Sequence, residues 1–237
     1  MKFTCTYMAV LVGALVALSV PACGDYILID FGPAAAGSYT NFDGTHYWNN
    51  VGGNETITSL RDSQNTLSGV QLSVAGATGV NTWNAGETPD PNLNGGLFAF
   101  DSVTRDGLYN NAGVTASVTL SNLSISATYN LVLYGSRQDF ERYTTYTVGA
   151  QSVELQTGYT TGTGFNSNHV VSLSGLAPDA NGVITMTFNG NAAPGGAGAT
   201  AFSYLNAMEI QVVPEPGTLG FALLGGCMAW RFRRWRS

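Results

Sequence analysis

The stretch that decides the fold is residues 178–182, Pro-Asp-Ala-Asn-Gly, followed by residues 183–188, Val-Ile-Thr-Met-Thr-Phe. The first five residues have the composition of a tight turn, because proline presets one backbone angle and Asp, Asn and Gly tolerate turn geometry. The next six alternate apolar and polar side chains, which is the period of a half-buried strand. Together they predict a turn that leads into a β-strand.

Similar short runs of β-branched and aromatic residues recur along the chain, at spacings of about 10–15 residues, between clusters of Gly, Asn and Asp. We find no apolar pattern of helix length and no repeat of solenoid or propeller period. The sequence therefore predicts an all-β sandwich or barrel. The expected strands lie at 26–31, 70–74, 97–100, 114–120, 129–134, 143–148, 183–188 and 201–212.

The charge of the chain is unevenly distributed. Residues 25–213 contain four basic and fourteen acidic side chains, a formal charge of −10. A nucleic-acid-binding surface needs Lys and Arg to displace counterions from phosphates, so this composition excludes that class of function. The three cysteines, Cys5, Cys23 and Cys227, all lie outside this region. We therefore expect neither a disulfide nor a cysteine-bound metal in the domain.

The N-terminal segment has the pattern of a secretory signal. Lys2 precedes an apolar run over 8–20, and the small residues of Val20-Pro21-Ala22 follow. These features predict a signal peptide over 1–22 and export of the domain. An alternative is a lipoprotein signal, in which Cys23 becomes the lipid attachment site.

The C-terminal segment over 213–237 has three parts in order. Pro214, Glu215 and Pro216 precede an uncharged stretch over 217–230, and an arginine cluster with Arg231, Arg233 and Arg234 ends the chain. This arrangement resembles the PEP-CTERM sorting signal of Gram-negative bacteria. The resemblance implies recognition by the membrane protease exosortase, a short membrane helix before processing, and a final place at the cell surface or in the extracellular matrix. A plain C-terminal membrane helix predicts the same topology.

Several stretches between the two ends resemble a domain common in PEP-CTERM proteins. The resemblance implies a jelly-roll β-sandwich over 25–212, similar to galactose-binding-like and carbohydrate-binding modules. The stretches that carry it are Leu28-Ile29-Asp30-Phe31-Gly32, Trp48-Asn49, 104–109, Tyr134-Gly135-Ser136-Arg137, 142–148, 178–182 and 204–210.

One segment has the spacing of a calcium loop. Asp90, Asn92 and Asn94 occupy alternate positions, Gly95 follows, and Asp101 stands at the twelfth position. Oxygen ligands at that spacing can wrap a calcium ion. The alternative is an Asn- and Gly-rich turn that leads into a strand over 97–100. A second candidate for structural calcium joins Asp30 on the first strand with Glu209 on the last.

Aromatic residues in polar, Gly-rich stretches are the candidates for ligand binding. An exposed ring can stack on the apolar face of a sugar while Asn, Asp and Arg bind its hydroxyls. The alternative is that these rings cap the ends of the sandwich core. The candidates are Trp48, Trp83, Tyr109, Tyr159 and Phe165.

Catalytic patterns are weak in this sequence. The domain has two histidines, His46 and His169, and no Gly-x-Ser-x-Gly elbow. Asp139 and Glu141 interleave with arginines, which favours a network of Arg and carboxylate groups over a catalytic pair. We therefore expect a non-catalytic protein that binds polysaccharide, and neutral or basic glycans rather than anionic ones. The alternatives are a structural matrix protein without a ligand and a glycoside-active enzyme.

Overall fold

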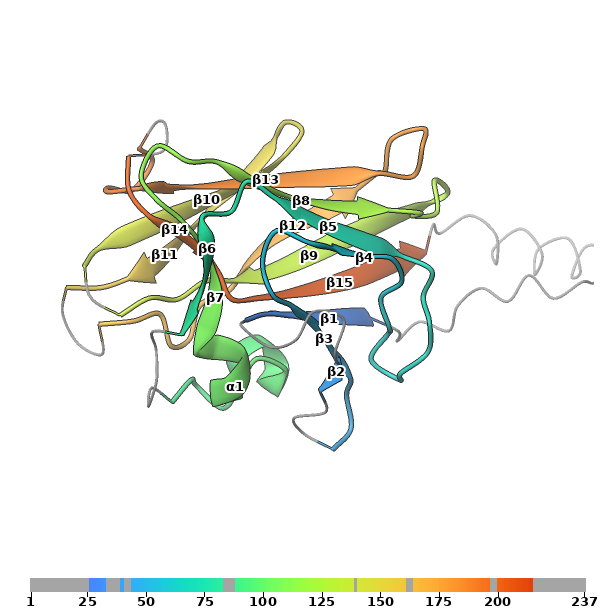
Figure 1. Ribbon diagram of the computed structural model, residues 1–237, viewed down its shortest axis with the longest axis horizontal. Coiled ribbons are helices and arrows are strands. Elements are labelled where there is room, and N and C mark those ends of the chain that lie inside the picture. The colour runs from blue at the N-terminus through green and yellow to red at the C-terminus, as the bar shows by residue number, and fades with distance from the viewer. Residues whose placement is uncertain are drawn as a thin grey trace, which may run out of the picture.

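The computed structural model describes residues 26–32, 39–40, 44–82, 88–138, 140–160, 164–196 and 200–214. They form a jelly-roll β-sandwich, as the sequence predicts (Figure 1). The first sheet contains, in spatial order, β12 (Val171–Leu176), β9 (Ala127–Tyr134), β15 (Ala207–Pro214), β1 (Tyr26–Phe31), β3 (Trp48–Val51) and β2 (Tyr39–Thr40). The second contains β11 (Gln151–Gly158), β10 (Arg142–Val148), β13 (Ile184–Asn191), β8 (Ala116–Ser121), β5 (Gln71–Ala75) and β4 (Thr56–Ile57).

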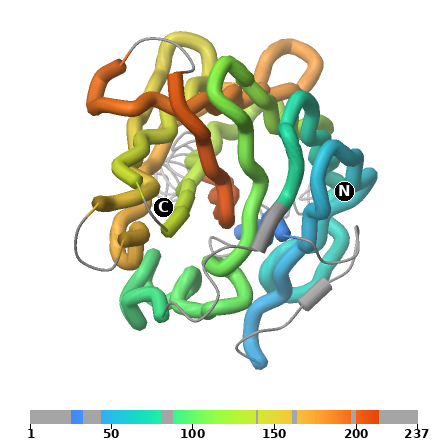
Figure 2. The backbone as a smooth tube through the Cα atoms, turned by 60° about the vertical axis from the view of Figure 1, so that its left-hand side comes forward, coloured from blue at the N-terminus to red at the C-terminus, as the bar shows by residue number. Residues whose placement is uncertain are grey.

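A third, three-stranded sheet is built from β14 (Ser203–Leu205), β7 (Asp106–Asn110) and β6 (Gly79–Thr82). Two short helices, η1 (Leu93–Gly96) and α1 (Asp101–Thr104), precede β7 in the chain. The first and last described strands are neighbours, because β1 pairs antiparallel with β15 and parallel with β3. Figure 2 shows the blue first strand next to the red last strand.

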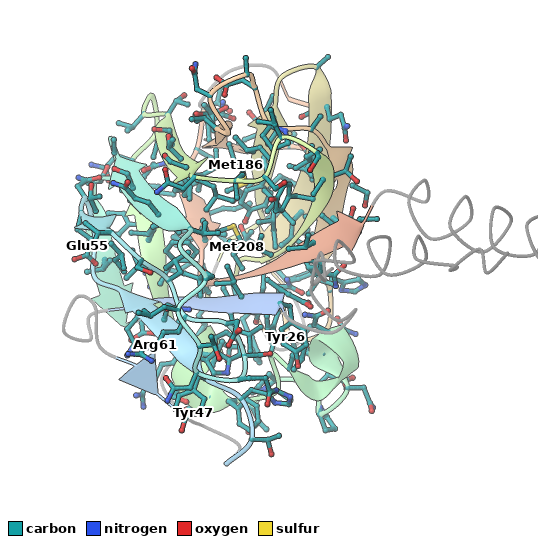
Figure 3. All side chains as sticks on the ribbon, turned by 90° about the vertical axis from the view of Figure 1, so that its right-hand side faces the viewer. Tyr26, Tyr47, Glu55, Arg61, Met186 and Met208 are labelled. Atoms are coloured by element: carbon teal, nitrogen blue, oxygen red, sulfur yellow. The ribbon has the colours of Figure 1, made fainter. Side chains whose placement is uncertain are left out.

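The main core fills the space between the two large sheets. Strand β8 alternates buried and partly exposed residues along its whole length, so only one of its faces packs inward. Met186 on β13 and Met208 on β15 are both buried in this layer and come from opposite sheets (Figure 3). Burial of one face from each sheet is the main source of stability for such a sandwich.

A second apolar cluster lies on the other face of the first sheet. On β1, Ile29 faces the main core while Leu28 belongs to this second cluster, so the strand is buried on both faces. The cover comes from residues 88–105, which supply Phe98 and Val103. In Figure 1 this segment, with α1, lies beneath the first sheet.

Most of the expected strands are confirmed, and two expectations are corrected. Residues 97–100 form a turn and not a strand, because Asn94 and Gly95 adopt left-handed backbone angles that curl the chain and bury Phe98. The expected strand over 201–212 is divided into β14 and β15 at Asn206, whose side chain binds neighbouring backbone groups.

The two terminal signals lie outside the described residues, apart from Pro214. This residue ends β15, opposite Ala127 of β9. The signal peptide, Glu215, Pro216 and the arginine cluster are therefore still sequence-based predictions. Within the described segments, no helix has the length and apolar character needed to cross a membrane.

Candidate binding surface

Trp48 does not offer a face to a ligand. Its side chain is fully buried in the second apolar cluster, and its ring centroid lies 5.7 Å from that of Phe98. Phe98 in turn lies 6.3 Å from the ring of Tyr134. The structure therefore matches the alternative for this residue, a ring that packs in the core. Trp83 lies outside the described residues.

The other three predicted rings differ in their exposure. Tyr109 and Tyr159 are half-buried, whereas Phe165 is buried. The pairing of β10 with β11 sets Gly158, the residue before Tyr159, opposite Arg142. Tyr109 pairs with Tyr204 across β7 and β14. Strand pairing thus brings two of the predicted residues close to Arg142 and Tyr204.

Arg142 lies among three aromatic rings, a group that the sequence did not single out. Its guanidinium carbon is 4.8 Å from the ring centroid of Phe202, 5.1 Å from that of Phe140 and 5.7 Å from that of Tyr204. These distances are within the range of cation–π attraction. We call Phe140, Arg142, Phe202 and Tyr204 the Arg142 patch.

Two rings of the Arg142 patch are exposed to solvent. Phe140 is 64% exposed and Phe202 is 36% exposed. Phe140 also has a φ of 69°, in the left-handed region that bulky residues rarely adopt. Such backbone strain is concentrated at functional sites, where the surrounding structure holds it in place. Phe140 thus combines an exposed ring with an uncommon backbone conformation beside Arg142.

The hydroxyl of Tyr204 forms the polar floor of the patch. It accepts a hydrogen bond from the guanidinium of Arg142, and Arg137 also bonds to it. Burial raises the pKa of Tyr204, while the positive charges of Arg142 and Arg137 act in the opposite direction. At neutral pH the group is a neutral phenol contacted by two cations.

The predicted Arg–carboxylate network takes a different form at Arg142. Glu141 accepts a hydrogen bond from the hydroxyl of Tyr143 at 2.6 Å, which raises the pKa of Tyr143 to about 12. Arg142 instead contacts rings and the Tyr204 hydroxyl, and it forms no ion pair within the described segments. Asp139 lies outside the described residues.

The candidate calcium loop has its side chains engaged by the protein. Asp90 accepts a hydrogen bond from the backbone N–H of Asn92 at 2.7 Å. Asn94 donates to Glu209 at 2.7 Å, and Asp101 pairs with Arg105 at 3.3 Å. Both carboxylate oxygens of Glu209 accept amide hydrogens, from Asn94 and Gln211. Calcium binding at this loop, and at Asp30 with Glu209, stays a sequence-based prediction.

A buried pair of carboxyl groups lies where β1 meets β7. Asp30 and Asp106 are both more than nine-tenths buried, and Oδ1 of each has no hydrogen-bond partner in the described part of the chain. Their neighbourhood depends on Gly32, since a Cβ there would lie 2.7 Å from the carboxylate of Asp106. No three His, Cys, Asp or Glu side chains within the described segments gather as a metal centre requires.

Both buried carboxyl groups have raised pKa values. Burial is the main cause for Asp30, the charge of Asp106 adds to it, and Arg105 opposes it. Burial raises the pKa of Asp106 to about 6, again against the opposing charge of Arg105. Since the charged form is disfavoured in a low-dielectric site, both groups hold protons more tightly than free aspartate.

Asn206 connects this buried region to the loop that carries the Arg142 patch. Its side-chain amide donates to the carbonyl groups of Thr104 and Asp106 at 2.9 and 2.7 Å, and its oxygen accepts from the N–H of Ser136 at 2.8 Å. Ser136 precedes Arg137 and Phe140 in the loop from β9 to β10. One side chain thus links α1, β7 and the loop from β9 to β10.

Comparison with solved structures confirms the fold class. The extracellular domain of ANXUR1 from Arabidopsis thaliana is similar over 81% of this chain and 49% of that chain, with 14% identity and a TM-score of 0.51. This chain therefore spans about half the length of that ectodomain. At this identity the likeness shows a shared fold and nothing about activity.

Two further similar structures overlap less well. β-Glucuronidase 2 of Bacteroides uniformis has 12% identity, a TM-score of 0.46, and coverage of 80% of this chain and 18% of that one. TmCBM61, solved with β-1,4-galactotriose, has 14% identity, a TM-score of 0.31, and coverage of 61% and 88%. No family model matches the sequence, and no curated protein is significantly similar to it. The functional argument therefore rests on the residues of this chain.

Proposed function

We propose that this protein is a non-catalytic glycan-binding protein whose ligand contacts the Arg142 patch. The observation that carries the proposal is the exposure of Phe140 and Phe202, both within cation–π distance of one guanidinium group. Exposed rings stack on the apolar faces of sugars, and Arg and Tyr groups bind their hydroxyls. Such shallow, solvent-facing contacts give weak binding per site, about micromolar to millimolar.

Two features support a binding role over a catalytic one. The carboxyl groups with the most strongly shifted pKa values, Asp30 and Asp106, are buried beside the segment that covers the first sheet. A polymer cannot reach such groups, whereas glycosidases place their carboxyl pair across an accessible scissile bond. Next to the patch, the carboxylate of Glu141 accepts a hydrogen bond from the hydroxyl of Tyr143, and we assign it no catalytic role.

The proposal includes the location that the two ends of the chain indicate. We propose that the protein is exported, processed by exosortase and retained at the surface or in the matrix of a Gram-negative cell. Deleting residues 214–237 should then release the protein from the envelope. Equally firm attachment of the truncated chain would favour anchoring through Cys23.

A direct test is titration calorimetry of the purified full chain with a panel of neutral and acidic oligosaccharides. Phe140→Ala should weaken binding of any ligand found by about 1–3 kcal/mol, by analogy with base–aromatic stacking. Ile125→Ala is the matched control, because Ile125 is 68% exposed in the loop between β8 and β9, at the other end of β9. If the two variants bind equally well, the Arg142 patch is not the site. If no glycan binds the unaltered chain, a structural matrix protein without a ligand becomes the better account of the function.

A further inference from the structure

Two cationic side chains share one neutral partner at the floor of the Arg142 patch. Arg142 and Arg137 both hydrogen bond to the hydroxyl of Tyr204, which is itself buried. Two groups that contact the same oxygen atom lie within a few ångströms of each other. Like charges at that separation repel, and the repulsion is stronger next to buried groups than in bulk water.

The rings around Arg142 hold the guanidinium without neutralising it. Contacts at 4.8 to 5.7 Å from three ring centroids attract the cation through the electron-rich faces of the rings. They leave its planar set of N–H donors suited to a partner with paired oxygen atoms. A carboxylate matches that geometry, since an Arg–carboxylate pair can form two parallel hydrogen bonds.

The Tyr204 hydroxyl gathers two of the few basic side chains of an acidic domain. Residues 25–213 carry a formal charge of −10, yet half of their four basic residues, Arg137 and Arg142, meet at Tyr204. Glu141, which precedes Arg142 in the sequence, accepts a hydrogen bond from the hydroxyl of Tyr143. A local cationic group on an acidic surface is complementary to one anionic group, not to a broad polyanion.

We propose that the glycan bound at the Arg142 patch is acidic, with a sugar carboxylate held by Arg142 and Arg137 and its ring against Phe140 and Phe202. This inference rests on the proposed glycan-binding function and reverses the preference that net charge alone predicts. The two effects act over different distances. Repulsion from the whole domain is screened beyond about 8 Å at physiological ionic strength, whereas direct Arg–carboxylate bonds persist.

The test uses pairs of oligosaccharides that differ only in charge. Trisaccharides of galacturonate, glucuronate and mannuronate are compared with their methyl esters, which keep the ring and lose the negative charge. Calorimetry on the full chain at 150 mM salt should give at least about tenfold tighter binding for one acid over its ester, the size expected for a charge-assisted hydrogen bond.

Variants of Arg142 separate charge from shape. Arg142→Gln should reduce the affinity for the acid to that for its ester, and Arg142→Lys should retain part of the difference because it keeps the charge without the planar fork. Ile125→Ala should leave both affinities unchanged. Melting curves of each variant check that the fold is intact.

Each remaining outcome has a definite meaning. If the esters or neutral oligosaccharides bind as tightly as the acids, and Phe140→Ala weakens both, glycan binding stands and the acidic preference is wrong. The preference is also wrong if Arg142→Gln binds the acid like the unaltered chain, or if no acid binds while neutral glycans do. If nothing in either panel binds, the proposed function itself fails.

Discussion

Two groups of aromatic residues in this molecule have similar composition and opposite environments. Trp48 and Tyr134 pack with Phe98 of the covering segment 88–105, and none of the three side chains has exposed surface. Phe140 and Phe202 both lie within cation–π distance of Arg142 and keep part of their surface exposed. The difference is the cover and not the ring type. Residues 88–105 fold over Trp48 and Tyr134, whereas the described structure leaves 64% of Phe140 and 36% of Phe202 exposed.

The first group stabilises the fold, and the proposed function assigns ligand recognition to the second. A buried ring contributes the free energy of its burial and packing, and an exposed ring contributes little until a ligand covers it. The following predictions test the contrast, from the largest expected effect to the smallest.

Trp48→Ala should lower the free energy of unfolding by about 3–5 kcal/mol, because it removes a large buried ring and leaves a cavity. Denaturant titration followed by circular dichroism measures the change. The folded fraction should bind glycan as the unaltered chain does. A loss below about 1 kcal/mol together with abolished binding would place Trp48 in the binding surface and break the contrast.

Asn206→Ala should lower the free energy of unfolding by about 3 kcal/mol. It leaves the N–H of Ser136 and the carbonyls of Thr104 and Asp106 without their partner, and each buried orphan costs about 1–3 kcal/mol. The exposed Asn111 provides the control, Asn111→Ala, whose effect should stay within about 0.5 kcal/mol. Equal melting temperatures for the two variants would contradict the linking role of Asn206.

Asp106 makes the buried region sensitive to pH. Its folded-state pKa of about 6 lies above the unfolded value, so its favourable contribution is complete below about pH 4 and is lost as the pH rises through 6. Asp106→Asn cannot ionise at this position, so the variant does not lose this contribution. The free energy of unfolding of the variant minus that of the unaltered chain should therefore rise by about 2 kcal/mol between pH 4 and pH 8. A difference that is constant with pH would show that Asp106 is ionised throughout this range.

Phe140→Ala should change the free energy of unfolding by no more than about 0.5 kcal/mol, because its ring is mostly exposed. Phe140→Gly should be at least as stable as Phe140→Ala, since glycine adopts a positive φ without steric cost. Thermal unfolding measures both variants. A loss of several kcal/mol would mean that this ring supports the fold, as Trp48 does.

The local patterns of the sequence predict the sandwich well. Alternation over 183–188 and the turn before it correspond to β13 and its preceding turn, and the run over 26–31 corresponds to β1. The burial of β1 on both faces does not follow from local pattern, because it depends on residues 88–105 folding back over the first sheet. The same long-range contact buries Trp48, although its neighbours in the sequence are polar and typical of a loop.

The binding surface was harder to predict than the fold. Phe140 and Phe202 are 62 positions apart, and only the packing of β14 against β10 brings them to the same arginine (Figure 1). One local signal pointed to an exposed ring. Phe140 stands between the charged residues Asp139 and Glu141, which favour a solvent-facing segment. Strand pairing places Tyr109 opposite Tyr204 and sets Gly158, the residue before Tyr159, opposite Arg142, so the roles of the two tyrosines in ligand binding stay predictions.

The most direct test of the account is to map the ligand contact by NMR. Amide chemical shifts of the labelled full chain are followed during titration with the tightest-binding oligosaccharide from the panel. The account predicts that the largest changes occur at 140–143 and 202–204, and that residues 48–51 and 93–98 are unaffected. Changes centred on Trp48 and its neighbours, with none at Phe140 or Phe202, would contradict it.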